Sequence, residues 1–281
     1  MLKKILVTGS NGFIGKELIK NISNFEIITD YQNDIRINLL STQDIMKIEP
    51  ADIVIHLAGK TPQKKLDDLD FLKNNLLTTI NILDYCIKKN IKKLIYVSSY
   101  VYGIPNYNPI NENHPIHPHN GYTESKYLGE SICKFISEKS KLKITILRPF
   151  NIYGDDMNEG YFLTNLLNCA KTDERIIISN KNSRRDFLHV NDFIDLILQC
   201  INLENNFEIF NAGSGQSFSL EEIITIIERS LDKKLNIEYV DEPMNELSRV
   251  EADINKIKNV LTWRPKRNFE NELLKMLDKK L

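Results

Sequence analysis

A tyrosine and a lysine four positions apart are the residues of this chain best suited to move a proton. Tyr122 and Lys126 stand in a run whose helical spacing places both side chains on one face. A phenol with an ordinary pKa near ~10 can act as an acid or base at neutral pH once nearby cations stabilise its anion. Lowering that pKa by about three units requires roughly 4 kcal/mol of electrostatic stabilisation. Two cations in a partly dry pocket can supply that amount.

A glycine-spaced turn near the start of the chain predicts what this pair acts on. The turn follows a short apolar run, Lys4–Thr8, and opens a segment with helical spacing, Phe13–Asn21. A strand, a glycine turn and a helix in this order bring backbone N–H groups against a pyrophosphate. We therefore predict a bound dinucleotide and hydride chemistry, with oxidised nicotinamide as the second cation. The predicted contacts of the turn are Gly9, Asn11, Gly12, Phe13, Ile14 and Gly15.

Asp30 ends the second predicted strand, residues 25–29. A carboxylate there accepts hydrogen bonds from an adenosine ribose and repels a 2′-phosphate, which favours NAD over NADP. Arg36 lies close in sequence and opposes this charge argument, so NADP stays the alternative. The next strand signal, residues 35–39, leaves little room for the usual intervening helix, and we expect a trimmed adenine side.

Alternating strand and helix patterns position these residues. Further strands are predicted at residues 53–57, 93–98 and 143–147, and helices at residues 74–89 and 122–140. This alternation predicts an α/β fold: a Rossmann-type doubly wound parallel sheet with a smaller carboxyl-terminal substrate-binding lobe. Loops at the carboxyl ends of such strands carry sites, and residues 106–120 form such a loop.

Beyond Gly154 the pattern is less regular. Helices are predicted at residues 161–171, 191–201 and 220–231, and strands at residues 185–190 and 208–210. At 281 residues the chain can bury a full core. We assign residues 1–154 plus about 186–212 to the NAD(P)-binding domain, and about 155–185 plus 213–281 to the substrate-binding lobe.

The composition describes an ordinary globule. The net charge is −1 and 42% of the residues are hydrophobic, which favours neither polyanion binding nor membrane attachment. The four cysteines stand singly in apolar segments, as in a reduced cytoplasmic protein. No metal site is predicted, because no carboxylate or cysteine completes a ligand set with the loop histidines His114, His117 and His119.

These residues together resemble the motifs of the extended short-chain dehydrogenases/reductases of the NAD-dependent epimerase/dehydratase family, whose members mostly act on nucleotide sugars. The resemblance extends from Lys4 to about Pro265. The matching runs are the glycine turn, His56-Leu57-Ala58-Gly59, Asn75 with Thr79 and Asn81, Ser98-Ser99-Tyr100-Val101-Tyr102-Gly103, Tyr122-x-x-x-Lys126, Arg148-Pro149-x-Asn151-x-Tyr153-Gly154 and Arg185-Asp186-Phe187-Leu188-His189-Val190.

The resemblance implies individual roles. Tyr122 is the catalytic acid or base, and Lys126 also holds the nicotinamide ribose. Ser98 sits three residues before Val101, where the family donates a hydrogen bond to the reacting sugar oxygen, and Ser99 is the neighbouring candidate. The further implied cofactor contacts are Asn38 and Leu39, which replace the family's Asp-Leu or Asp-Ile, with Leu57, Ala58, Gly59 and Asn75.

For the diphosphate of the substrate, the resemblance implies contacts from Asn151 and Arg185, with Arg249 as a third. An arginine suits phosphate because its planar fork can bind two oxygens. Arg249 has an equally weighted alternative as a surface residue near Glu251 and Asp253. The family also implies a homodimer formed through the helices at residues 74–89 and 122–140.

Several reactions fit these residues. Family dehydratases place an aspartate-glutamate pair where this chain has Ser99 and Tyr100, so a 4,6-dehydratase is disfavoured. Reduction of a 4-keto-(6-deoxy)hexose linked to a nucleoside diphosphate, by exchangeable NAD(P)H, is favoured slightly. A UDP-glucose 4-epimerase-like enzyme with tightly bound NAD is the alternative. A non-catalytic NAD(P)H-binding regulator and a relative that reduces a non-sugar carbonyl are less favoured, because the chain keeps Tyr122, Lys126 and the diphosphate candidates.

Overall fold

The computed structural model describes residues 2–32, 35–62, 66–157, 159–240 and 249–280. The chain divides into two compact units, each assembled from separate stretches of sequence. The first unit contains Met1–Gly103, Ile116–Pro149 and Ile194–Phe210, and the second contains Ile104–Pro115, Phe150–Phe193 and Asn211–Leu281. Each unit is described by itself below.

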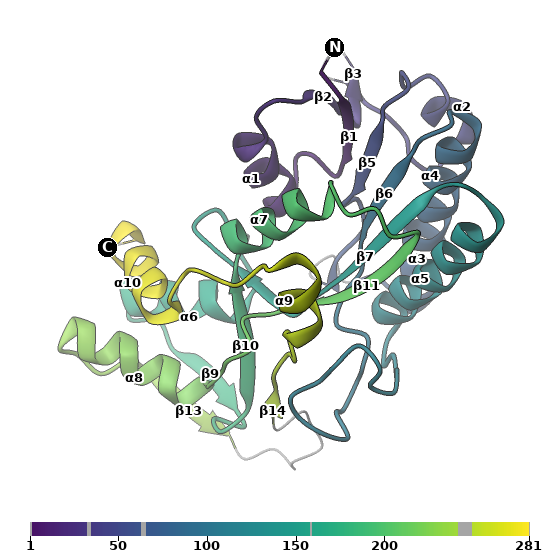
Figure 1. Cartoon of the computed structure of the whole chain (residues 1–281). Coiled ribbons are helices and arrows are strands. Elements are labelled where there is room, and N and C mark those ends of the chain that lie inside the picture. Colours follow the sequence, from purple (N-terminus) through teal and green to yellow (C-terminus); the bar gives the residue numbers. More distant parts are fainter. Residues whose placement is uncertain (1, 33–34, 63–65, 158, 241–248, 281) are drawn as a thin grey trace. The chain divides into compact units, whose positions relative to one another are not determined.

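A six-stranded sheet with the order β11-β7-β6-β5-β1-β2 forms the centre of the first unit (Figure 1). Strands β1, β2, β5, β6 and β7 pair in parallel. Their sequences are almost continuously apolar, since helices cover both faces. The Rossmann-type sheet predicted from the sequence is therefore confirmed. Its strands are β1 (Lys4–Thr8), β2 (Glu26–Thr29), β5 (Ile53–His56), β6 (Lys93–Val97), β7 (Lys143–Pro149) and β11 (Phe207–Ala212).

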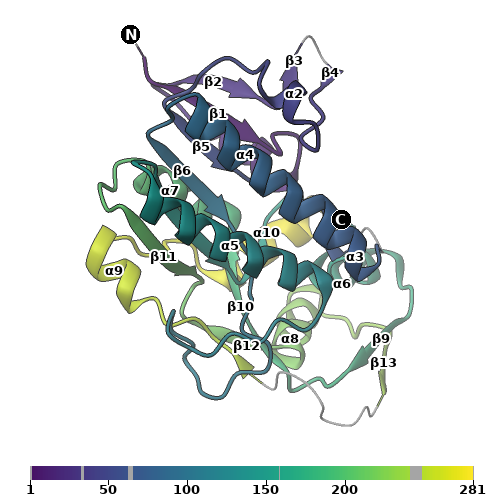
Figure 2. The ribbon, with the colours of Figure 1, turned by 90° about the vertical axis from the view of Figure 1, so that its right-hand side faces the viewer.

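Helices α4 and α5 lie side by side on one face of this sheet, and α1 and α7 lie on the other (Figure 1, Figure 2). Buried apolar side chains such as Ile82, Cys86 and Cys133 join α4 and α5 to the strands. The helices are α1 (Phe13–Asn21), α2 (Thr42–Ile45), α3 (Asp68–Phe71), the π-helical turn η2 (Leu72–Leu76), α4 (Leu77–Lys88), α5 (Gly121–Lys139) and α7 (Val190–Cys200).

The register of the central strands aligns their carboxyl ends. Thr8 of β1 pairs with His56 of β5, and His56 pairs in turn with Tyr96 of β6. The segments that follow these residues therefore leave the sheet at one edge. That edge carries the glycine turn, the loop after β5 and Ser98, as parallel topology requires.

The segment between β2 and β5, which is the predicted adenine side of the first unit, is short. Among the strands that the structure describes, none pairs with the outer edge of β2. Between β2 and β5 the described residues contain the antiparallel pair β3 (Tyr31–Gln32) and β4 (Ile35–Arg36), followed by the four-residue helix α2. The expected lack of a full helix is confirmed, whereas the strand expected at residues 35–39 ends at Arg36.

Most predicted elements lie within one or two residues of the observed ones, but the helix expected at residues 74–89 begins earlier. Helical structure starts at Asp68, where the Asp67 side chain accepts a hydrogen bond from Asp70 N at 2.7 Å. The π turn η2 interrupts the regular spacing before α4. Such a turn shifts the helix face by one residue, which hides the continuity of the apolar pattern.

The second unit has a four-stranded sheet in which β12, β10 and β14 are adjacent and β8 pairs with β10, plus the parallel pair β9 and β13. A core with Leu166, Ile227 and Leu273 at its centre packs helices α6, α8 and α10 together. The elements are β8 (Asn151–Tyr153), α6 (Phe162–Thr172), β9 (Ile176–Ser179), β10 (Arg184–His189), β12 (Ser217–Ser219), α8 (Leu220–Leu231), β13 (Ile237–Val240), β14 (Arg249–Val250), α9 (Asn255–Leu261) and α10 (Phe269–Lys280).

All four cysteines are buried and free of disulfides. Within the described ranges, no helix is both long and apolar enough to span a bilayer. The described residues also contain no cluster of three or more histidine, cysteine and acidic side chains arranged to bind a metal.

Candidate active site

The glycine turn between β1 and α1 is closely packed against the loop after β5. Gly9 has a φ of +74°, and a Cβ added there would lie 2.7 Å from the backbone nitrogen of Ala58. A Cβ on Gly15 would lie 2.2 Å from the carbonyl oxygen of Gly9. Helix α1 begins without a side-chain cap and without an acidic residue in its first turn. Its free N–H groups therefore fit a pyrophosphate.

Asp30, which follows β2, is hydrogen-bonded to the glycine turn. The residue is 1% exposed. Its Oδ2 accepts a hydrogen bond from Gly9 N at 3.1 Å, and its Oδ1 accepts from Ser10 N at 3.1 Å and from Ser10 Oγ at 2.6 Å. The carboxylate predicted to contact a ribose thus holds the turn in place with both oxygens.

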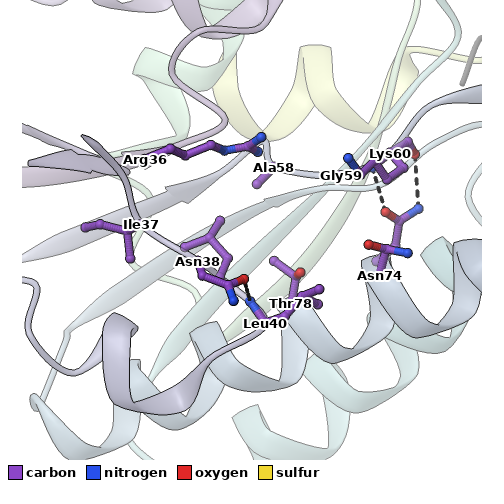
Figure 3. Close-up of a pocket in the computed structure, with 11 residues that line it drawn as sticks. Arg36, Ile37, Asn38, Leu40, Ala58, Gly59, Lys60, Asn74 and Thr78 are labelled. Atoms are coloured by element: carbon purple, nitrogen blue, oxygen red, sulfur yellow. Dashed lines mark hydrogen bonds between the residues drawn. The ribbon is translucent and has the colours of Figure 1, made fainter. Parts of the chain in front are cut away.

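A pocket of about 300 Å³ adjoins the loop after β5, whose Ala58 packs against Gly9 of the turn (Figure 3). It receives the predicted contacts Asn38 and Leu39 from the segment after β4, and Ala58 and Gly59 from the loop after β5. Asn38 Oδ1 accepts a hydrogen bond from Leu40 N at 3.1 Å, which shapes one wall. The described residues that line it are Arg36, Ile37, Asn38, Leu39, Leu40, Ala58, Gly59, Lys60, Asn74, Asn75 and Thr78. Leu57, another predicted contact, is in the same loop as Ala58 but not in this lining.

Asn75 connects the pocket to helix α5. Its Oδ1 accepts from Lys60 N at 2.7 Å, and its Nδ2 donates to Lys60 O and to Ser125 Oγ, both at 3.1 Å. Asn75 is 2% exposed and lies in the π turn η2. Its amide therefore bonds to protein groups and holds the loop after Gly59, while Asn75 also lines the pocket as a predicted cofactor contact.

Lys126 is buried beneath this loop. Its Nζ donates a hydrogen bond of 2.9 Å to the carbonyl oxygen of Val97 and lies 5.2 Å from the centre of the Tyr96 ring. A Cβ on Gly59 would be 3.3 Å from that Nζ. Burial lowers the pKa of Lys126 to about 8, against the opposing charge of Glu130. Lys126 is therefore a cation that can lose its proton near neutral pH.

Tyr122 is held in the first turn of α5 by three restraints. Asn120 and Thr123 form a capping box. The Asp68 carboxylate accepts a hydrogen bond of 2.6 Å from Gly121 N, so α3 fixes the start of α5. The Tyr122 ring meets the Phe71 ring edge-on with centroids 5.8 Å apart. Tyr122 itself is half-buried at this restrained helix start.

Ser98 directly follows β6 and Val97, the residue that binds Lys126. Ser98 is 2% exposed, and within the described structure its Oγ has no hydrogen-bond partner. A buried hydroxyl without a partner is uncommon and is explained when a ligand supplies one. Ser99 is half-buried next to it. The structure thus brings the predicted serines to the same strand end as the lysine.

His56 lies under the site with both ring nitrogens engaged. Its Nδ1 is 2.7 Å from Thr8 Oγ1 and its Nε2 is 3.3 Å from Thr79 Oγ1. Burial, and then the charge of Lys126, lower the pKa of His56 to about 3. A neutral imidazole therefore sits below Lys126 and adds no competing positive charge.

One part of the site was not predicted from the sequence. Arg148 donates from Nε and Nη2 to the Glu130 carboxylate at distances of 2.6–3.1 Å, and from Nη1 to Tyr102 Oη at 2.8 Å. Both charged side chains are almost fully buried. Burial opposes the charge of Arg148, but Glu130 raises its pKa overall. The available signal was that Glu130 follows Lys126 by four residues on the same helix face.

The predicted diphosphate contacts lie on neighbouring strands of the second unit, with Asn151 and Arg185 on one face of the sheet and Arg249, which pairs with Arg184, on the other. Asn151 is on β8 and donates from Nδ2 to Asp186 O at 2.9 Å. Arg185 is on β10, where it pairs in register with Val250 next to Arg249. Arg185 donates to the Ser183 hydroxyl and to Arg184 O, the latter at 3.0 Å. Arg249 forms an ion pair of 2.8 Å with Glu251, yet half of its side chain remains exposed.

Comparisons with known proteins agree with this geometry. A model of the NAD dependent epimerase/dehydratase family matches residues 5–213. A putative UDP-glucose 4-epimerase from Methanocaldococcus jannaschii is 30% identical over 98% of this chain and 97% of that protein. A dTDP-4-dehydro-6-deoxyglucose reductase from Escherichia coli is 28% identical over 93% of this chain and 92% of that protein. The structure of RMD from Pseudomonas aeruginosa complexed with NADPH superimposes with a TM-score of 0.89 and 26% identity, covering 99% and 98% of the two chains.

Proposed function

Because the chain belongs to the NAD-dependent epimerase/dehydratase family, whose members bind NAD(P), we propose that it reduces the 4-keto group of a sugar linked to a nucleoside diphosphate, most simply a 4-keto-6-deoxyhexose. The similarity to the bacterial 4-dehydro-6-deoxyglucose reductase supports this reaction. The neighbour bound to NADPH supports a reduced dinucleotide as the hydride source.

The residues of the first unit fit the cofactor. The uncapped N-terminus of α1 and the turn at Gly9 and Gly15 would hold the pyrophosphate. Lys126 would hold the nicotinamide ribose. When bound, the reduced nicotinamide supplies a hydride to C4 of the sugar.

Tyr122 then supplies the proton. As C4 accepts the hydride, its oxygen becomes basic and takes the phenolic proton of Tyr122. The Lys126 ammonium stabilises the phenolate left behind, since it lies on the same face of α5 one turn further along. The unpartnered hydroxyl of Ser98 donates a hydrogen bond to the C4 oxygen and orients it.

The observation that carries the choice of a reductase is the short adenine side. The sheet ends at β2, and only the β3–β4 pair and the four-residue α2 stand between β2 and β5 in the described chain. A cofactor held by so few elements buries less surface and dissociates more readily. A reductase needs such exchange at every turnover, whereas an epimerase retains its NAD.

A 4-epimerase that keeps its NAD is the second candidate, favoured by the 30% identity to the archaeal protein. The two reactions need the same Ser98, Tyr122 and Lys126, so the catalytic geometry supports both equally. The absence of the dehydratases' acidic pair, with Ser99 and Tyr100 in its place, argues against loss of water.

For the substrate, we propose that Asn151 and Arg185 bind the diphosphate, because the strand register places them on one face of the small sheet. Arg249 is in register with Arg184 and so is on the other face, and as a third contact it would reach the diphosphate around the edge strand β14. When the diphosphate binds, Arg249 would either leave its ion pair with Glu251 or bind Glu251 and the phosphate together. The protein is proposed to act as a homodimer through α4 and α5. Exposed apolar side chains on these helices, Leu77, Ile80, Ile87 and Phe135, support that contact.

The test is a substrate panel. Purified protein is incubated with UDP-, dTDP- and GDP-hexoses and their 4-keto forms, with NADH or NADPH. Stoichiometric oxidation of the reduced cofactor with one 4-keto sugar is the expected result. Interconversion of C4 epimers without net oxidation would establish the epimerase instead, and no reaction with any of these sugars would reject both.

A further inference from the structure

We infer that Arg36 binds the 2′-phosphate of the cofactor and makes this protein selective for NADPH over NADH. The inference rests on the dinucleotide site of the proposed function and adds the identity of the cofactor. It reverses the preference for NAD that the position of Asp30 suggested in the sequence.

The first step is the loss of Asp30 as a ribose ligand. NAD-selective sites present a free carboxylate to the ribose hydroxyls, and the same charge repels a 2′-phosphate. Here the Asp30 oxygens already accept three hydrogen bonds, from Gly9 N, Ser10 N and Ser10 Oγ. With 1% of its surface exposed, Asp30 has almost no area left to present to a ligand.

The second step is the charge of the pocket. Arg36 and Lys60 are the charged side chains among the described residues of its lining, and none of those residues is an aspartate or glutamate. No described residue forms an ion pair with the guanidinium of Arg36, and the side chain is exposed. A cation without a described acidic partner is suited to an anion, and the planar guanidinium is suited to phosphate in particular.

The third step is position. Arg36 ends β4, which pairs with β3 directly after Asp30, so it belongs to the adenosine end of the site. Figure 3 shows its side chain extending across the pocket towards Ala58. Lys60 lies at the other end of the pocket in that view, where its backbone is bonded to Asn75, and Asn75 is bonded to Ser125 of α5. The two cations therefore serve different parts of the cofactor.

The pair supplies a matched comparison, since each substitution removes one positive charge from the same pocket. Calorimetric titration with NADPH and NADH is performed on the wild-type protein, Arg36→Gln and Lys60→Gln. We expect the wild-type protein to bind NADPH more tightly than NADH. Arg36→Gln weakens NADPH binding by about 10- to 100-fold, the range for a charged hydrogen-bonded contact, and leaves NADH binding unchanged. Lys60→Gln changes the affinities for NADPH and NADH by the same factor.

Adenosine 2′,5′-bisphosphate and AMP isolate the contact from the nicotinamide end. The bisphosphate is expected to bind more tightly and to lose affinity more steeply with added salt, and both differences disappear in Arg36→Gln. Equal affinity of the wild type for NADPH and NADH, or an equal loss of both in Arg36→Gln, would overturn the inference while leaving the proposed function intact. Failure of the wild type to bind either dinucleotide would reject the proposed function, and the inference with it.

Discussion

The ammonium of Lys126 donates a hydrogen bond of 2.9 Å to the carbonyl oxygen of Val97, the residue that immediately precedes Ser98. This contact joins the second turn of α5 to the carboxyl end of β6. It ties the lysine, one turn from Tyr122, to the residue next to Ser98, whose hydroxyl lacks a partner within the described chain. A strand end and a helix face that are distant in sequence thus meet in the proposed catalytic group.

Replacing Tyr122 by phenylalanine is expected to lower kcat by about 10²–10⁴-fold, the usual contribution of a positioned acid. Cofactor affinity should stay near that of the wild type, because the ring keeps its edge contact with Phe71 and α5 keeps its capping box. Steady-state kinetics and calorimetric titration measure the two effects. A variant with normal turnover, or with biological activity unaffected by the loss of turnover, would indicate a binding or regulatory protein.

The burial of Lys126 predicts an alkaline limit on activity. Its pKa in the free enzyme is lowered to about 8 by burial, so the ammonium is present below that pH and is lost as pH rises through it. The value of kcat/KM for reduction should fall above about pH 8 for this reason. In Lys126→Arg, whose guanidinium stays charged, the fall should move to higher pH even if the rate is lower. If kcat/KM begins to fall at the same pH in the wild type and in Lys126→Arg, then the titration of Lys126 does not cause the alkaline limit.

His56 predicts a loss of stability in acid. Its folded-state pKa is lowered to about 3 by burial, so between about 6.5 and 3 the unfolded chain binds a proton that the native state does not. The free energy of unfolding should therefore decrease as pH falls through this range, by up to about 1.4 kcal/mol per pH unit. Urea unfolding between pH 7 and pH 5 tests this. His56→Gln does not titrate, so the pH dependence should be weaker in that variant, and equal slopes would contradict the assignment.

The buried ion pair between Arg148 and Glu130 is expected to be essential for positioning α5. Removing one partner, as in Glu130→Leu, leaves an uncompensated buried charge and should lower the free energy of unfolding by about 3–5 kcal/mol. Removing both, in Glu130→Leu/Arg148→Leu, should recover much of that loss. Urea unfolding of the wild type, of the single variants Glu130→Leu and Arg148→Leu, and of the double variant gives the comparison. If the single substitutions leave the free energy of unfolding nearly unchanged, then neither buried charge needs the other in the folded protein, and the prediction is wrong.

Much of the first unit follows from local patterns. The apolar runs of β1, β5 and β6, the glycine turn and the helical spacing of Tyr122 and Lys126 depend only on residues within a few positions of one another. The strands and helices built on them lie within one or two residues of the prediction. The helix before α4 was the exception, since the π turn around Asn75 breaks the spacing on which such predictions rely.

The sequence by itself determined the parallel sheet and the glycine turn, and it singled out the pair proposed to transfer the proton, because spacing along the chain controls which side chains share a helix face or follow a strand. The tertiary structure alone decided how those groups behave. Asp30 became a support of the turn because the fold places Gly9 and Ser10 against it. Arg36 became an exposed cation in the wall of the pocket proposed to bind the cofactor, and Lys126 acquired a lowered pKa. Charge, hydrogen bonding and burial depend on neighbours that are far away in the chain, and only folding brings them together.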